Sequence, residues 1–203
     1  MARFLLICSV LVLASCSGLS QEECMNADWE AIGFEDGVVG KGLEKVGDYR
    51  EDCAKHAIKV DLERYKYGRN IGLKDFCQPA SAFQAGRRGY IYKGVCPADL
   101  EPAFVGPYEE GRIVFRAEQR FNRAESELNG AENSIDRIER DIRNREQELL
   151  DDKTAADRRR QLYNQIEDLK RDLYREKEKI RDLHEEVYQA RREFEDAQAQ
   201  YGR

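Results

Sequence analysis

The C-terminal half of the chain carries a repeating pattern of apolar residues. Between Phe121 and Ile142, and again between Ile166 and Tyr201, apolar side chains recur at alternating steps of three and four. This spacing is typical of the a and d positions of a coiled coil. The positions are Phe121, Ala124, Leu128, Ala131, Ile135, Ile138, Ile142, Ile166, Leu169, Leu173, Ile180, Leu183, Val187, Ala190, Phe194, Ala197 and Tyr201.

The pattern fails between these two runs. The first register, continued, places Arg145, Asp152 and Arg159 at core positions. Thr154 followed by Asp157 is typical of a helix start, with the threonine as its cap. The failure therefore predicts a break in the helix close to residue 152.

We expect the region 113–203 to form two helices, at about 113–150 and 155–201, folded as an antiparallel hairpin. At 1.5 Å per residue the helices are about 57 and 70 Å long. The alternative is one continuous rod with a stutter, which would dimerise through its seam.

A second region, residues 24–112, is rich in glycine and aromatic residues. It shows no sustained two-residue alternation, so we expect short helices joined by turns rather than strands. Glycines four apart share a helix face, and such a face lets another helix lie close. Alternatively, Asp36-Gly37 is a turn and Gly72 ends a helix. The four-residue pairs are Gly33–Gly37 and Gly68–Gly72.

An aromatic-x-x-Gly unit recurs in the same region, three times followed directly by arginine. Stacking rings and guanidinium groups are suited to a sugar or an anion. The alternative interpretation is that the rings fill the core while the arginines bridge surface carboxylates. The candidate ligand-binding residues are Tyr65, Arg69, Phe83, Arg87, Tyr108 and Arg112.

The first residues resemble an export signal. Residues 1–15 contain one arginine and an apolar run too short to span a bilayer. Leu13–Cys16 resembles a lipobox, so we expect lipid on Cys16 and a linker over residues 16–23. We expect the protein on the periplasmic face of the outer membrane, because residue 17 is serine and not the aspartate that retains lipoproteins at the inner membrane. The alternative is an ordinary signal peptide with an incidental Cys16.

Four further cysteines precede residue 97. An even number in an oxidising compartment predicts two disulfides, and three connectivities stay open. Zinc is disfavoured because no C-x-x-C pair occurs and Cys53 with His56 forms at most half a site. We expect no metal and no cofactor. The four are Cys24, Cys53, Cys77 and Cys96.

The segments DWEAIGFEDGVVG, YKYGRNIGLKDFCQP and AFQAGRRGYIYKGVCPADLEPAF, followed by YEEGR, resemble a bacterial lipoprotein family, the domain of unknown function 2799. The resemblance runs from Trp29 to Arg112 and implies lipidation, paired cysteines and a helical tail, with no known activity. Gly106-Pro107 departs from the pattern and argues against an unbroken helix from Leu100.

The net charge and the small number of histidines argue against two classes of protein, enzymes and nucleic-acid binders. The net charge is -6 and only two histidines occur, His56 and His184. Neither lies beside a nucleophile and a carboxylate in a catalytic pattern, so we expect no enzyme. Export and acidic charge argue against nucleic acid.

These observations favour a mainly α, non-enzymatic lipoprotein, anchored to the outer membrane through Cys16. A disulfide-stapled module would carry a coiled coil that engages an envelope protein or a second copy of the chain. The alternative function is a periplasmic module that binds peptidoglycan or a small anion through the aromatic-x-x-Gly-Arg units.

Overall fold

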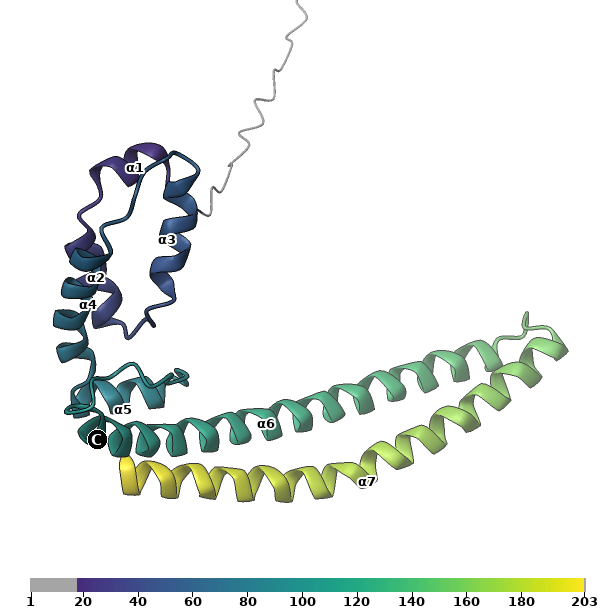
Figure 1. Ribbon diagram of the computed structural model, residues 1–203. Helices are drawn as coiled ribbons and strands as arrows, with labels where there is room; N and C mark the ends of the chain where they lie inside the picture. The colour runs from purple at the N-terminus through teal and green to yellow at the C-terminus, as the bar shows by residue number, and fades with distance from the viewer. Residues whose placement is uncertain (1–17, 203) are drawn as a thin grey trace, which may run out of the picture. The chain divides into compact units, whose positions relative to one another are not determined.

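The computed structural model describes residues 18–202, which form seven helices and no strand (Figure 1). The predicted mainly α fold is therefore confirmed for this part of the chain. The helices are α1 (Gln21–Asn26), α2 (Trp29–Val38), α3 (Lys45–Ala54), α4 (Leu62–Phe76), α5 (Pro79–Arg87), α6 (Glu101–Leu150) and α7 (Ala156–Tyr201).

The chain forms two compact units. In the described part, unit 1 contains residues up to Ser81 together with Tyr92–Phe104, and unit 2 contains Ala82–Ile91 together with the residues from Val105 onward. Each unit contains a helix crossing built on glycine, and unit 2 also contains the long C-terminal hairpin.

Both expected disulfides lie in unit 1, and the structure resolves their connectivity. Cys24 bonds to Cys53 and ties α1 to the end of α3, while Cys77 bonds to Cys96. Cys53 is fully buried. The first bridge belongs to a core cluster with Trp29, Val46 and Tyr65. A module of this size buries little apolar surface, so the disulfide supplies part of its stability.

Helices α2 and α4 of unit 1 cross through their glycine faces. A Cβ atom added to Gly33 would lie 2.1 Å from the carbonyl oxygen of Tyr65, and one added to Gly72 would lie 2.2 Å from that of Phe34. No side chain fits at these distances. The predicted glycine strip is confirmed. Gly72 lies inside α4 and does not end it, and Gly37 is a helical residue in the last turn of α2.

The same crossing recurs in unit 2 between α5 and α6. A Cβ atom on Gly86 would lie 2.1 Å from the carbonyl oxygen of Tyr108, and one on Gly111 would lie 2.2 Å from that of Phe83. In four of these contacts, at Gly33, Gly72, Gly86 and Gly111, the carbonyl belongs to the aromatic residue that stands three positions before the facing glycine.

The ends of α2 and α5 repeat each other as well. Gly40 follows α2 and Gly89 follows α5. Their φ angles are positive, 72° and 76°, and glycine adopts such angles without strain. Each lies against an aromatic ring, of Phe76 and of Phe115 respectively, where a Cβ atom would come within 2.4 Å. The backbone hydrogen bonds at both ends form a Schellman motif.

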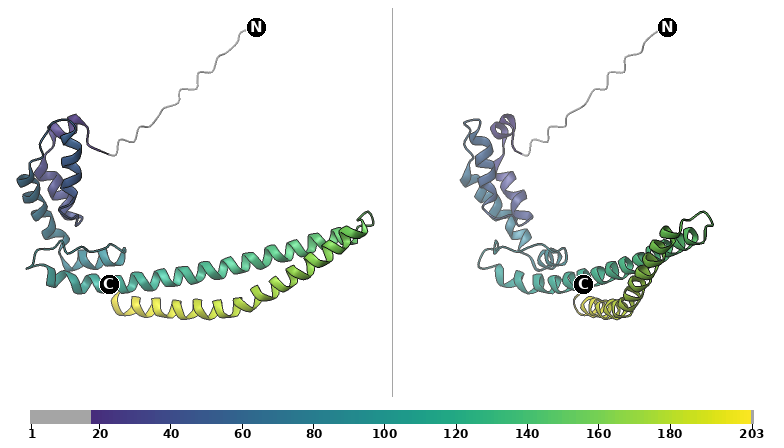
Figure 2. Two further views of the ribbon diagram at one scale, coloured as in Figure 1. Left: turned by 45° about the vertical axis from the view of Figure 1, so that its right-hand side comes forward. Right: turned by 90° about the vertical axis from the view of Figure 1, so that its right-hand side faces the viewer.

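Helices α6 and α7 lie side by side in every view (Figures 1 and 2). Ion pairs connect Arg120 to Glu193 and Glu139 to Lys177, separations of 73 and 38 residues that shorten toward the turn. The antiparallel hairpin is therefore confirmed and the single rod is not formed. Every predicted seam position is buried or half-buried, and the fully buried Leu162 extends the seam by one position that the pattern did not include.

Two local expectations were wrong. Helix α6 begins at Glu101 and continues through Pro107, because the preceding Gly106 has no Cβ atom to clash with the proline ring and a long helix tolerates one missing hydrogen bond. Thr154 does not cap α7, whose N-cap is Ala155. Its hydroxyl instead donates to the carbonyl oxygen of Glu148, 2.6 Å away, at the end of α6.

The glycine crossing yields a first prediction. Gly72→Ala forces two helix backbones apart, so we expect it to lower the free energy of unfolding by about 1–3 kcal/mol, as overpacking does. The matched variant Gly130→Ala, in α6, meets nothing within 4 Å and should raise that free energy by up to about 1 kcal/mol. Urea denaturation measures both, and equal effects of the two variants would contradict the crossing.

Candidate functional site

The predicted ligand-binding residues of unit 1 are engaged inside the chain. Tyr65 is fully buried, and its hydroxyl donates to Asp36 Oδ2 at 2.8 Å. Arg69 is 8% exposed and donates from Nε to the carbonyl oxygen of Lys41, also at 2.8 Å. This arginine therefore holds the segment that follows α2 rather than facing solvent.

The predicted ligand-binding residues of unit 2 also contact other groups of the protein. The Tyr108 hydroxyl donates to the carbonyl oxygen of Tyr90 at 2.8 Å, and Arg112 Nη1 donates to that of Gly89 at 3.2 Å. Phe83 is buried at the crossing, and Arg87 forms an ion pair with Glu118. These contacts favour the interpretation that the rings fill the core, although only Arg87 bridges a surface carboxylate as expected.

A buried carboxylate that the sequence did not single out lies at the centre of unit 1. Asp36 is 4% exposed and accepts hydrogen bonds from Tyr65 and from Tyr49, at 3.1 Å for the second, while Lys41 Nζ lies 3.0 Å from Oδ1. In the sequence, the only feature that points to a buried Asp36 is its position directly before the crossing glycine Gly37.

Asp36 changes the titration of both phenols. Burial and the neighbouring Asp36 charge raise the pKa of Tyr49 to about 12. Burial, followed by the hydrogen bond to Asp36, also raises the pKa of Tyr65. Both phenols therefore remain protonated donors at neutral pH, so this cluster is suited to holding α2, α3 and α4 together rather than to proton transfer.

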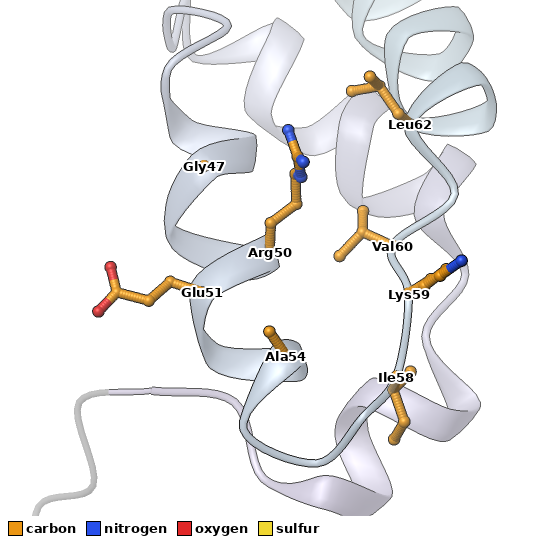
Figure 3. A pocket seen from close by; sticks show the side chains of 8 residues that line it. All are labelled: Gly47, Arg50, Glu51, Ala54, Ile58, Lys59, Val60 and Leu62. Atoms are coloured by element: carbon orange, nitrogen blue, oxygen red, sulfur yellow. The ribbon is translucent and has the colours of Figure 1, made fainter.

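An open groove of about 540 Å³ lies in unit 1 between α3 and the extended segment that leads into α4 (Figure 3). Sequence patterns did not reveal it, because its walls face each other only through the turn that follows α3. The lining residues are Gly47, Arg50, Glu51, Ala54, Ile58, Lys59, Val60 and Leu62.

The outer surface of the hairpin is a third candidate. Tyr163, Tyr174 and Tyr188 of α7 are 58%, 67% and 58% exposed. Their spacings of 11 and 14 residues are close to three and four helical turns, so the three rings lie along one flank of α7. None of them has a hydrogen bond or ring contact within residues 18–202.

A ladder of glutamates runs beside the seam on α6. Glu125 lies 3.7 Å from Arg191, and Glu139 lies 2.8 Å from Lys177. The hydrogen bond from Lys177 lowers the pKa of Glu139. These pairs fix which side of α7 faces α6 and leave the tyrosine flank uncovered. Five glutamates recur at seven-residue intervals, at Glu118, Glu125, Glu132, Glu139 and Glu146.

The remaining sequence-predicted features add no site. Cys16 lies outside the described residues, and His56 and His184 are exposed. Within residues 18–202, three or more potential metal ligands gather nowhere. None of the described helices combines the length and apolarity that a membrane span requires.

Comparison with known proteins gives one match. Residues 28–113 match the family described as Protein of unknown function (DUF2799). The match starts at Asp28, the N-cap of α2, and covers both glycine crossings. No curated protein and no solved structure matches the chain.

The Asp36 cluster yields a second prediction. Tyr65→Phe removes a buried hydrogen bond to a carboxylate, and we expect a loss of about 1.5–3 kcal/mol in the free energy of unfolding. Folding raises the pKa of Tyr65, so its protonated phenol adds to the free energy of unfolding. This contribution is present in full below the pKa of tyrosine in the unfolded chain, near 10, and is lost as the pH rises from there through the folded pKa.

Denaturation at pH 7 and over pH 9–12 tests this prediction. Tyr65→Phe should lose less stability between pH 9 and 12 than the parent chain does. Tyr163→Phe, at an exposed position, serves as the control and should match the parent chain. A variant as stable as the parent at pH 7 would show that the cluster contributes nothing.

Proposed function

We propose that this chain, whose residues 28–113 belong to the DUF2799 family, is a non-enzymatic lipoprotein of a bacterial cell envelope. In this proposal, lipid on Cys16 anchors it to the periplasmic face of the outer membrane. The lipobox-like sequence Leu13–Cys16 supports the anchor. Two disulfides support an oxidising compartment.

The hairpin is the element through which the protein would act on a partner. Its apolar seam is buried between α6 and α7, so the seam itself is not free for a second protein. A partner would therefore meet an outer face of the hairpin.

The observation that carries the proposal is the tyrosine flank of α7, defined by Tyr163, Tyr174 and Tyr188. Tyrosine is enriched in protein interfaces because it combines a large apolar face with one polar group. These three rings contribute nothing to the seam and are more than half exposed. Charged residues between them, such as Lys170 and Arg181, provide the polar rim that interfaces commonly have.

Less support remains for a module that binds peptidoglycan or a small anion through the aromatic-x-x-Gly-Arg units. Such binding needs guanidinium and phenol groups that face a ligand. In the described chain, Tyr65, Arg69, Tyr108 and Arg112 instead donate to carboxylate or carbonyl oxygens of the protein.

Site-specific photo-crosslinking tests the proposal. A photoreactive residue is placed at Tyr163, Tyr174 or Tyr188 of the lipidated protein in intact cells, and at Asp168, an exposed residue on another flank of α7, as the control. We expect the tyrosine positions to give one discrete adduct, with an envelope protein or with a second copy, at least five times more abundant than at Asp168. Adducts of equal abundance at all four positions, or none, would contradict an interaction role for this flank.

A further inference from the structure

The groove between α3 and the segment Ile58–Leu62 is built as a binding site. Ala54 of α3 faces a wall in which Ile58, Val60 and Leu62 alternate with polar residues, so one side of the extended segment is apolar. These three residues also pack against the core cluster that contains Cys53, which anchors the wall. Figure 3 shows the opening between the two walls.

One charged side chain points into this opening. Arg50 extends from α3 toward the space between the walls, whereas Glu51 and Lys59 point away from it (Figure 3). Within residues 18–202, the side chain of Arg50 forms no ion pair and no hydrogen bond. A guanidinium group beside apolar walls and without a carboxylate partner is suited to an anion supplied from outside the chain.

Gly47 gives an independent reason for the same conclusion. Glycine is among the least favourable residues inside a helix, and the other helical glycines of unit 1, Gly33, Gly37, Gly68 and Gly72, all touch a facing backbone. At Gly47 a Cβ atom would meet nothing within 4 Å. The missing side chain thus serves no packing in the described chain, and it leaves space in the groove.

The turn that connects the two walls is also unusual. Ala57 has a φ angle of 57°, the only positive φ angle of a residue other than glycine among residues 18–202. Ala57 takes the place that Gly40 and Gly89 take after α2 and α5: its N–H donates to the carbonyl oxygen of Ala54, and the next N–H donates to that of Cys53, which is a Schellman helix end. Here the turn reverses the chain directly after Cys53 and sets the apolar wall opposite α3.

We propose that this groove binds a carboxylate that carries an unbranched apolar tail, as in a fatty acid. Arg50 pairs with the carboxylate, and the tail lies along Ala54, Ile58, Val60 and Leu62 over the space left by Gly47. The volume of about 540 Å³ is within the range of small-molecule sites. This site is separate from the tyrosine flank and does not depend on the function proposed for the hairpin.

Titration of the full chain, with both disulfides intact, tests the site. The probes are decanoate, below the concentration at which it forms micelles, and decanol as the uncharged match. Isothermal titration gives the affinities. Fluorescence of Trp29, the only tryptophan, reports independently because this ring lies in the cluster against which the apolar wall packs.

We expect the chain to bind decanoate at least tenfold more tightly than decanol. Arg50→Gln should weaken decanoate at least tenfold and leave decanol unchanged, since only the charged contact is removed. Gly47→Leu should fill the groove and weaken both probes at least tenfold without lowering the melting temperature. Gly130→Leu, at an open helical glycine of α6, should change neither affinity.

Three results would overturn the proposal. The first is no decanoate binding by the parent chain, and the second is equal affinity for decanoate and decanol. The third is unchanged binding in folded Gly47→Leu or Arg50→Gln. An unaltered circular dichroism spectrum and melting temperature establish that the variants are folded, so loss of binding cannot be confused with loss of structure.

Discussion

The direct approach of one helix backbone to another at paired glycines is the constraint on which this fold depends. At such a crossing the Cα atom of one helix meets the carbonyl oxygen of the next, and the adjoining aromatic rings then have a fixed place beside it. Each glycine costs the helix about 1 kcal/mol relative to alanine. Close packing along the contact offsets that cost through many small dispersion contacts. Side chains from the facing helix also hold the loops that follow α2 and α5. Arg69 donates to the carbonyl oxygen of Lys41, and Tyr108 donates to that of Tyr90.

The two units are stabilised by different means. Unit 1 is small, and it combines two disulfides with the buried Asp36 cluster, where two phenols and one ammonium group satisfy a carboxylate. The hairpin of unit 2 contains no cysteine and relies on a long apolar seam bordered by ion pairs. Surface ion pairs contribute little energy individually. Their periodic arrangement along α6 matters more for register, because a shifted helix would lose its Glu125 and Glu139 contacts together.

Features with a local signal could be predicted from the sequence. Seven-residue periodicity indicated the seam and the break in it, and the number of cysteines indicated two disulfides. Connectivity could not be predicted, because all three pairings suit the same spacing until the helices are placed. Pro107 was misread because its effect depends on Gly106, and Thr154 because its hydroxyl serves the preceding helix instead of the next one. The groove was missed because Gly47 looks like the packing glycines in sequence and differs from them only in what surrounds it.

The repeated crossing has a consequence for how this fold can vary. Between Gly40 and the start of α4 the chain forms α3, whereas between Gly89 and the start of α6 it forms no helix. The same scaffold thus accepts a connection with or without an inserted helix. In this chain the inserted helix is part of the core, because Val46 and Cys53 of α3 belong to the core cluster and the Tyr49 hydroxyl donates to Asp36. The inserted helix thus brings to the first crossing the Cys24–Cys53 disulfide, the Tyr49 hydrogen bond and one wall of the groove.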